Sequence, residues 1–224
     1  MYNATILKEL EYMPVFSLSD VNQYINNKDY AKKFLRKMVK NNVMTKIKKN
    51  HYTLYKDPLL ISTFLIKPSY ITSISALSYH KLITQIPNEI YCATNKNVKN
   101  ISSEMKINFI YTKYFFGFKN EEYERFKIPI ADPEKAIIDS ISIIPISIIE
   151  EAFDDINKEN MISYLKRIKK SSIIKRIGYL MEKYNYNIYD EVKNLINYKY
   201  IPLDPCSNLK GEKDKKWGLI INIK

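Results

Sequence analysis

Residues 28–56, KDYAKKFLRKMVKNNVMTKIKKNHYTLYK, carry the pattern that decides the fold. In the first half of this stretch, apolar residues recur at the spacing of one helix face. These apolar residues are Ala31, Phe34, Leu35, Met38 and Val39. The positions between them are basic, namely Lys32, Lys33, Arg36, Lys37 and Lys40. The pattern predicts a helix from about Asp29 to Asn41, with an apolar face that packs and a cationic face in water.

The second half of the stretch predicts a basic β-hairpin. Two β-prone runs, 43–48 and 52–55, are joined by Lys49, Asn50 and His51, and asparagine readily takes the left-handed conformation of a tight turn. Upstream, the sequence predicts helices at 3–12 and from Ser17 or Ser19 to about residue 27, with a short strand at 15–18 between them. Helix, strand, helix, helix, strand, strand is the order of a winged helix-turn-helix.

Positive charge is concentrated in this stretch. Ten Lys or Arg against one Asp give 28–56 a net +9, whereas the whole chain carries +12. Such a surface favours a polyanion, nucleic acid before an anionic membrane. We expect the lysines to contact phosphates and Arg36 to bind guanine, although a solvated lysine face is the alternative for the helix alone. The predicted DNA-binding residues are Lys28, Lys32, Lys33, Arg36, Lys37, Lys40, Lys46, Lys48, Lys49, Asn50 and His51.

The composition indicates a folded protein, because 46% of the 224 residues are hydrophobic and 13% are aromatic. Cys92 and Cys206 form no CxxC pair, so we expect a reduced, cytoplasmic protein without a disulfide framework or metal cluster. The N-terminal sequence does not read as a signal peptide, and no apolar run reaches the length of a membrane span. We expect no cofactor and no membrane partner.

Beyond residue 58 the chain alternates helix and strand signals. Asp57 and Pro58 favour the start of a short helix at 59–66, and Asp132 and Pro133 that of another. Strands are predicted at 89–94, 107–111, 114–118 and 123–130, with a charged turn at 119–122. Further helices are predicted at 159–170, 171–184 and 188–196, before a terminal strand at 217–223 that returns to the central sheet. The predicted fold is α+β: an N-terminal winged helix-turn-helix domain (1–58) followed by a mixed α/β C-terminal domain (59–224).

Signals for an enzyme are weak. The chain lacks GxxxxGK[ST], GxGxxG and HExxH patterns, and it holds four glycines in all. His80 has serines nearby without a nucleophile elbow. Asp132 and Asp139 would share a helix face, but helix capping is the stronger reading of Asp132. The spacing of acidic residues around Asp204 is too generic to indicate a nuclease site. We therefore predict no enzymatic activity. A nucleic-acid-processing enzyme that uses Asp132, Asp139 or Asp204 is a competing hypothesis.

Several stretches together resemble the AbiEi family, the antitoxin and transcriptional regulator of type IV abortive-infection systems. They occur in the family's order and cover almost the whole chain. The stretches are LRKMVKNNVMTKIKKNHYTLY (35–55), YITSISALSYHKLITQIPNEIYCAT (70–94), IPIADPEKAIIDSI (128–141), IKRIGYLMEKYNYN (174–187) and YIPLDPCSNLKGEKDKKWGLIIN (200–222). The chain departs from the family at the wing turn, where Asn50 and His51 stand in place of an expected glycine.

The resemblance implies an antiviral-defence protein that represses its own operon. It would bind inverted repeats in double-stranded operator DNA as a homodimer or as paired monomers. Its C-terminal domain would counteract a cognate nucleotidyltransferase-like toxin. Gly178, Trp217 and Asp204 match the family's C-terminal motif, and we favour structural roles for them.

A second group of cations lies in the C-terminal half, and we expect it to extend the DNA surface or to meet an acidic partner such as the toxin. The group is Lys166, Arg167, Lys169, Lys170, Lys175 and Arg176. The competing interpretation of the whole chain is a stand-alone winged-helix transcription factor whose C-terminal domain senses a small ligand.

Overall fold

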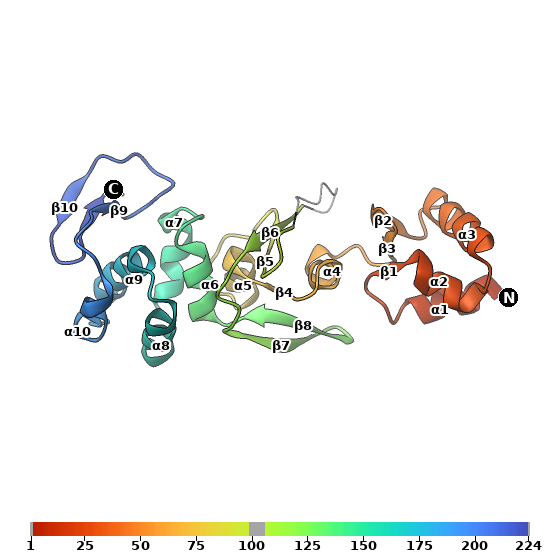
Figure 1. Cartoon of the computed structure of the whole chain (residues 1–224), viewed down its shortest axis with the longest axis horizontal. Helices are drawn as coiled ribbons and strands as arrows, with labels where there is room; N and C mark the ends of the chain where they lie inside the picture. The colour runs from red at the N-terminus through yellow and green to blue at the C-terminus, as the bar shows by residue number, and fades with distance from the viewer. Residues whose placement is uncertain (1, 99–105, 224) are drawn as a thin grey trace.

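The protein has an α+β architecture with its N-terminal and C-terminal elements at opposite ends of an elongated molecule (Figure 1). The computed structural model describes residues 2–98 and 106–223. These residues form ten α-helices and three β-sheets. Among them, no helix has the length and apolar character needed to cross a bilayer. Buried apolar side chains form two clusters, a smaller one within 6–44 and a larger one within 47–219.

The N-terminal part follows the predicted order of elements. Its elements are α1 (Tyr2–Leu10), β1 (Phe16–Ser17), α2 (Leu18–Ile25), α3 (Lys28–Lys40), β2 (Thr45–Lys48) and β3 (His51–Thr53). The three strands form an antiparallel sheet in the order β1-β3-β2. Ser17 is the N-cap of α2, and its backbone N–H donates to Asp20 Oδ2 at 2.6 Å in a capping box. The sequence allows either Ser17 or Ser19 to cap this helix, and the structure shows that the cap is Ser17.

Helix α3 forms where the periodicity predicts it. The side chain of Asn27 caps its first turn by accepting from the backbone N–H groups of Asp29 and Tyr30. Ala31, Phe34, Leu35 and Met38 are buried on one face of the helix. They join a small core with residues from α1, β1 and α2, namely Ile6, Leu10, Phe16 and Val21. Burial of this face fixes the rotation of α3 about its own axis.

The middle of the chain forms a five-stranded sheet of order β6-β5-β4-β8-β7. Its elements are β4 (Ser69–Ile71), β5 (Ile90–Thr94), β6 (Ile107–Tyr111), β7 (Phe118–Tyr123) and β8 (Phe126–Ala131). The β4–β8 and β5–β6 pairs are parallel, and the β4–β5 and β7–β8 pairs are antiparallel. The predictions of a charged turn at 119–122 and a strand at 114–118 are wrong. The charged residues lie instead on β7, an edge strand, and the chain reverses at Glu124, which has a positive φ of 52°.

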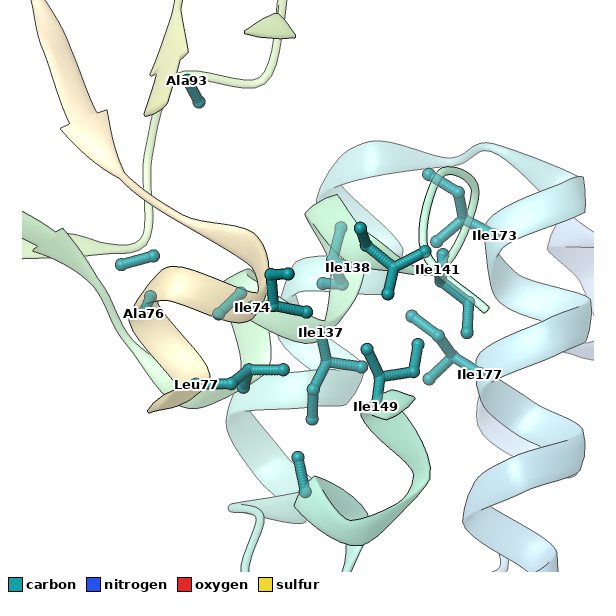
Figure 2. Packing of buried hydrophobic residues seen from close by; sticks show 14 of the residues in the cluster. Ile74, Ala76, Leu77, Ala93, Ile137, Ile138, Ile141, Ile149, Ile173 and Ile177 are labelled. Atoms are coloured by element: carbon teal, nitrogen blue, oxygen red, sulfur yellow. The ribbon is translucent and has the colours of Figure 1, made fainter. Parts of the chain in front are cut away.

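Helices pack around this sheet and continue toward the C-terminus. They are α4 (Pro58–Leu65), α5 (Ser73–Tyr79), α6 (Pro133–Ser140), α7 (Ile146–Ile149), α8 (Lys158–Ile168) and α9 (Ser171–Lys183), with a 3-10 turn at Glu150–Phe153. Asp57 and Asp132 cap α4 and α6 as predicted. Figure 2 shows isoleucines of α6, α7 and α9 packing together beside Ile74 and Leu77 of α5. This aliphatic layer joins the sheet to the helical part.

The C-terminal part closes on α9 and not on the central sheet. It contains α10 (Tyr189–Val192), a 3-10 turn (Lys193–Leu195), β9 (Ile201–Pro202), β10 (Glu212–Asp214) and β11 (Leu219–Ile221). These strands form a separate sheet of order β10-β11-β9, so the prediction that the last strand returns to the central sheet is wrong. Trp217 is buried against Gly178 of α9, and its Nε1–H donates to Glu182 Oε2 at 2.9 Å. The structural roles predicted for Gly178 and Trp217 are confirmed.

The tip of the β7–β8 hairpin contacts the N-terminal part. Arg125 lies over the rings of Tyr12 and Tyr55, and its guanidinium donates to the Tyr55 hydroxyl. The Tyr123 hydroxyl donates to Asp57 Oδ2 at 2.5 Å. That bond and burial raise the pKa of Tyr123 to about 12. Two side chains of one hairpin therefore fasten the segment that leads from the small sheet into α4.

We predict that Gly178→Ala destabilises the protein. A Cβ at this position would lie 2.2 Å from a ring carbon of Trp217, so the indole ring or α9 must shift. Overpacking of this kind costs about 1–3 kcal/mol. Urea unfolding followed by Trp217 fluorescence measures the loss. Ser163→Ala on the exposed side of α8 is the control and should change stability by less than about 0.5 kcal/mol; equal stability of Gly178→Ala and wild type would contradict the packing described.

Candidate nucleic-acid interface

The solvent-facing side of α3 is a continuous basic surface. Its residues are Lys28, Lys32, Lys33, Arg36, Lys37 and Lys40, all of them exposed. Lys32 lies 3.2 Å from Asp29 in an exposed ion pair of the kind that water largely screens. In the described part of the chain, no acid forms an ion pair with Lys28, Lys33, Arg36, Lys37 or Lys40. Five of the six cations of α3 therefore remain available to an anionic partner.

The β2–β3 hairpin adds a second, smaller basic surface. Lys46 and Lys49 are exposed, and Asn50 takes the left-handed conformation with φ 61°. Asn50 thus supplies the turn geometry for which a glycine was expected. His51 is half-buried, with Nδ1 3.0 Å from the Lys49 carbonyl oxygen, and the tautomer protonated at Nδ1 donates to it. In Figure 1, α3 and β2 run along the upper side of the N-terminal part, with α1 and α2 below.

Lys48 differs from the other lysines of the hairpin. It is half-buried, and its ammonium donates to the Leu65 carbonyl oxygen at the end of α4, 3.2 Å away. Burial lowers the pKa of this ammonium because a less hydrated environment disfavours its charge. The neighbouring Ile47 packs into the larger cluster. Lys48 thus holds the hairpin to α4, and we leave it out of the candidate interface.

The second group of cations divides into exposed and buried members. Lys166, Arg167, Lys169 and Lys170 are exposed at the end of α8 and the connection to α9. Lys175 and Arg176 are 1% and 7% exposed, so placing these two on a binding surface is wrong. Lys175 Nζ donates to Asn197 Oδ1 at 3.0 Å, and Arg176 Nε donates to the Pro202 carbonyl at 3.0 Å. Burial lowers the pKa of both side chains.

The carboxylates of the enzyme hypothesis have structural partners. Asp132 Oδ1 accepts from the Lys135 backbone N–H at 2.9 Å, and its Oδ2 accepts from the Tyr164 hydroxyl at 2.6 Å. Asp204 accepts from the Cys206 backbone N–H at 2.8 Å. His80 Nε2 lies 2.8 Å from the Ala131 carbonyl oxygen. In the described residues, no three His, Cys, Asp or Glu side chains gather as a metal site would require.

Asp139 belongs to a buried polar network that the sequence did not predict. Its Oδ2 accepts from the Thr72 hydroxyl at 2.7 Å and the Tyr70 hydroxyl at 2.9 Å, and its Oδ1 accepts from Lys135. The Lys135 side chain is fully buried, and its Nζ also donates to Tyr70 at 2.7 Å. Burial lowers the pKa of Lys135, whereas Asp139 raises it. The i,i+4 spacing of Lys135 and Asp139 on a helix whose central residues are apolar was the available signal.

Comparison with known proteins adds no assignment to this geometry. No protein-family model matches the chain, and no match was found among curated proteins.

We predict that Asp139→Asn destabilises the protein by about 3–5 kcal/mol, because it leaves the buried Lys135 charge without its counter-ion. Removing the carboxylate leaves burial as the main influence on Lys135, so its pKa falls further below 10.5. At any pH between the lowered pKa of Lys135 in the folded variant and its pKa near 10.5 in the unfolded chain, the folded variant binds fewer protons than the unfolded chain. Its stability should accordingly rise, relative to wild type, as the pH is raised from neutrality toward 10.5.

Chemical unfolding across this pH range measures the effect. Asp190→Asn, which alters an exposed ion pair with Lys193, is the control and should have little effect. Adding Lys135→Met to Asp139→Asn should restore part of the lost stability, since neither buried charge then remains. A pH-independent loss, or no loss, would contradict the role of the ion pair.

Proposed function

We propose that the protein is a DNA-binding transcriptional autorepressor and the antitoxin of a type IV toxin–antitoxin system. The observation that carries the DNA half is the exposed basic face of α3, opposite a face buried in the N-terminal core. The order of elements and the β1-β3-β2 sheet support a winged helix-turn-helix over residues 1–58. In this proposal α3 is the recognition helix and the β2–β3 hairpin is the wing.

The lysines and the one arginine of this interface have different proposed roles. Lysine ammonium groups form strong, non-directional contacts with phosphates and supply affinity without sequence preference. Arg36 alone on α3 has the planar guanidinium that can donate two parallel hydrogen bonds to guanine O6 and N7. In this proposal Lys46 and Lys49 of the hairpin contact the flanking DNA backbone. In this proposal the lysines position the protein on the DNA backbone, and Arg36 recognises a base.

The antitoxin half of the proposal is supported by the resemblance of five stretches to the AbiEi family. Three of those stretches cover α6, most of α9 and the C-terminal sheet, and Trp217 packs there against Gly178 of α9. The exposed cations 166, 167, 169 and 170 offer an acidic partner a surface separate from α3. We propose that operator binding uses the N-terminal part and that toxin neutralisation uses the remainder of the chain.

We predict that the full chain binds DNA from upstream of its own gene with a steep dependence on salt. If six to ten phosphates are contacted, affinity falls by roughly three to five decades between about 50 and about 200 mM salt. Arg36→Ala combined with Lys37→Ala should weaken binding by roughly tenfold or more. Lys119→Ala with Lys210→Ala removes the same charge from exposed sites outside the N-terminal part and is the matched control.

Fluorescence anisotropy over a salt series measures both effects. Equal losses in the two double variants would show that only net charge matters. That result, like the absence of binding at low salt, would overturn the role of α3.

We predict that co-expression with the product of the neighbouring gene restores growth if that product is a nucleotidyltransferase-like toxin. Rescue should persist in the Arg36→Ala, Lys37→Ala variant when both genes are driven by an unrelated promoter, because neutralisation is assigned to the remainder of the chain. Colony counts and protein levels are the measurements. Failure of the wild-type chain to rescue would remove the antitoxin half of the proposal and leave the DNA half standing.

A further inference from the structure

A cavity of about 570 Å³ opens at the carboxyl ends of the parallel strands β5 and β6. The other walls come from α6 and from the connection that leads into α9. Ala93, Ile138 and Ile173 form part of its apolar lining, and Figure 2 shows them on three different elements around the aliphatic layer. The carboxyl edge of parallel strands is a common place for ligands, and this volume is in the range of small-molecule sites.

The polar lining of the cavity is cationic. Lys113, Lys169 and Lys170 line it, and all three are exposed. Among the described lining residues the one acid is Asp139, whose carboxylate is already paired with Lys135. No acid in the described chain forms an ion pair with Lys113, Lys169 or Lys170. The cavity therefore has a net positive potential that favours an anionic ligand.

Lys169 and Lys170 form the connection between α8 and α9, with exposed side chains. Lys169 takes the left-handed conformation with φ 52°, and its N–H donates to the Leu165 carbonyl oxygen at 2.9 Å. Lys170 follows as the N-cap of α9, which has no capping side chain. The N-terminus of α9 lies at this wall together with the C-terminal ends of α6 and α8, so their helix dipoles oppose one another and the positive charge of the wall comes from the ammonium groups.

Aromatic rings complete the lining. Tyr111 is 59% exposed at the end of β6, and Tyr114 lies beside it in the loop that follows. The ammonium of Lys113 is 5.0 Å from the centre of the Tyr114 ring. The exposed ring of Tyr111 favours stacking with a planar ligand, whereas Tyr114 is half-buried, and neighbouring ammonium groups favour phosphate. Both preferences are met by one small molecule that carries a planar ring and a phosphate.

We propose that this cavity binds a free nucleotide of the size and chemistry of a nucleoside monophosphate. Its phosphate pairs with Lys169 and Lys170, its base stacks on Tyr111 or Tyr114, and its sugar lies over the apolar floor. Asp139 can accept a hydrogen bond from a ligand hydroxyl at the inner wall. This site is separate from the basic face of α3 but shares Lys169 and Lys170 with the surface proposed for an acidic partner, so a nucleotide and that partner would compete for these two lysines. The inference does not depend on the proposed function.

Isothermal titration of the full chain without DNA tests the proposal. The probes are the adenosine, guanosine, cytidine and uridine monophosphates, their unphosphorylated nucleosides and inorganic phosphate, all at one ionic strength. We expect one saturable site that binds at least one monophosphate more tightly than its nucleoside and than inorganic phosphate. No saturable binding of any monophosphate at millimolar concentration would overturn the proposal.

Variants locate the site. Lys169→Ala with Lys170→Ala should weaken monophosphate binding by at least about tenfold, and Tyr111→Ala should weaken it as well. Lys119→Ala with Lys210→Ala, the control of equal charge, should bind as wild type does. All five substituted residues are exposed, so the three variants should fold normally. Thermal unfolding without nucleotide, unchanged from wild type, verifies this. Equal affinity of the two double-lysine variants would overturn the assignment.

A short single-stranded oligonucleotide distinguishes a free nucleotide from a nucleic-acid strand as the source of the same chemistry. We expect the monophosphate to bind alone and the oligonucleotide to compete weakly or not at all. Binding of the oligonucleotide without binding of any monophosphate would assign the cavity to nucleic acid and overturn the proposal.

Discussion

Packing of α3 through Ala31, Phe34, Leu35 and Met38 is the constraint on which the candidate interface depends. Once these four side chains are buried, the helix has no rotational freedom, and the basic residues between them must face water. The free energy of that arrangement comes from apolar burial, and the charges themselves add little to stability at an exposed surface. The basic face is therefore a consequence of the core, held in register by Asn27 at one end of the helix and by the small antiparallel sheet beyond the other.

Local chemistry made much of the fold predictable from sequence. Periodicity predicts α3, Asp57 and Asp132 predict the starts of α4 and α6, and Ser17 or Ser19 predicts the start of α2, because capping and helical spacing are properties of a few neighbouring residues. The sequence predicts a turn at the charged residues of β7, because an edge strand can place many charges in water and then lacks the apolar alternation that identifies a strand. Sheet membership of β11 depends on distant pairing and was also predicted wrongly.

The candidate site shows the same division. The exposure of Arg36 and Lys37 follows from the periodicity of α3 alone. Lys175 and Arg176 are buried because the C-terminal segment covers α9, which the local sequence does not indicate. In sequence Lys48 resembles the other lysines of the hairpin, but in the structure its ammonium donates to the carbonyl oxygen of Leu65 at the end of α4. The Asp139 network is a long-range feature too, since Tyr70 and Thr72 precede Asp139 by more than sixty residues. The winged helix, the domain boundary at residue 58 and the AbiEi assignment remain predictions.

The claim that the N-terminal part presents α3 and the β2–β3 hairpin to DNA is tested most directly by amide hydrogen exchange. Exchange would be measured by mass spectrometry on the full chain, with and without DNA from upstream of its own gene. The proposed function predicts slower exchange in peptides covering 28–40 and 45–53 when DNA is bound. Slower exchange confined to 166–170, or exchange unchanged by DNA under conditions in which the protein is saturated, would contradict it.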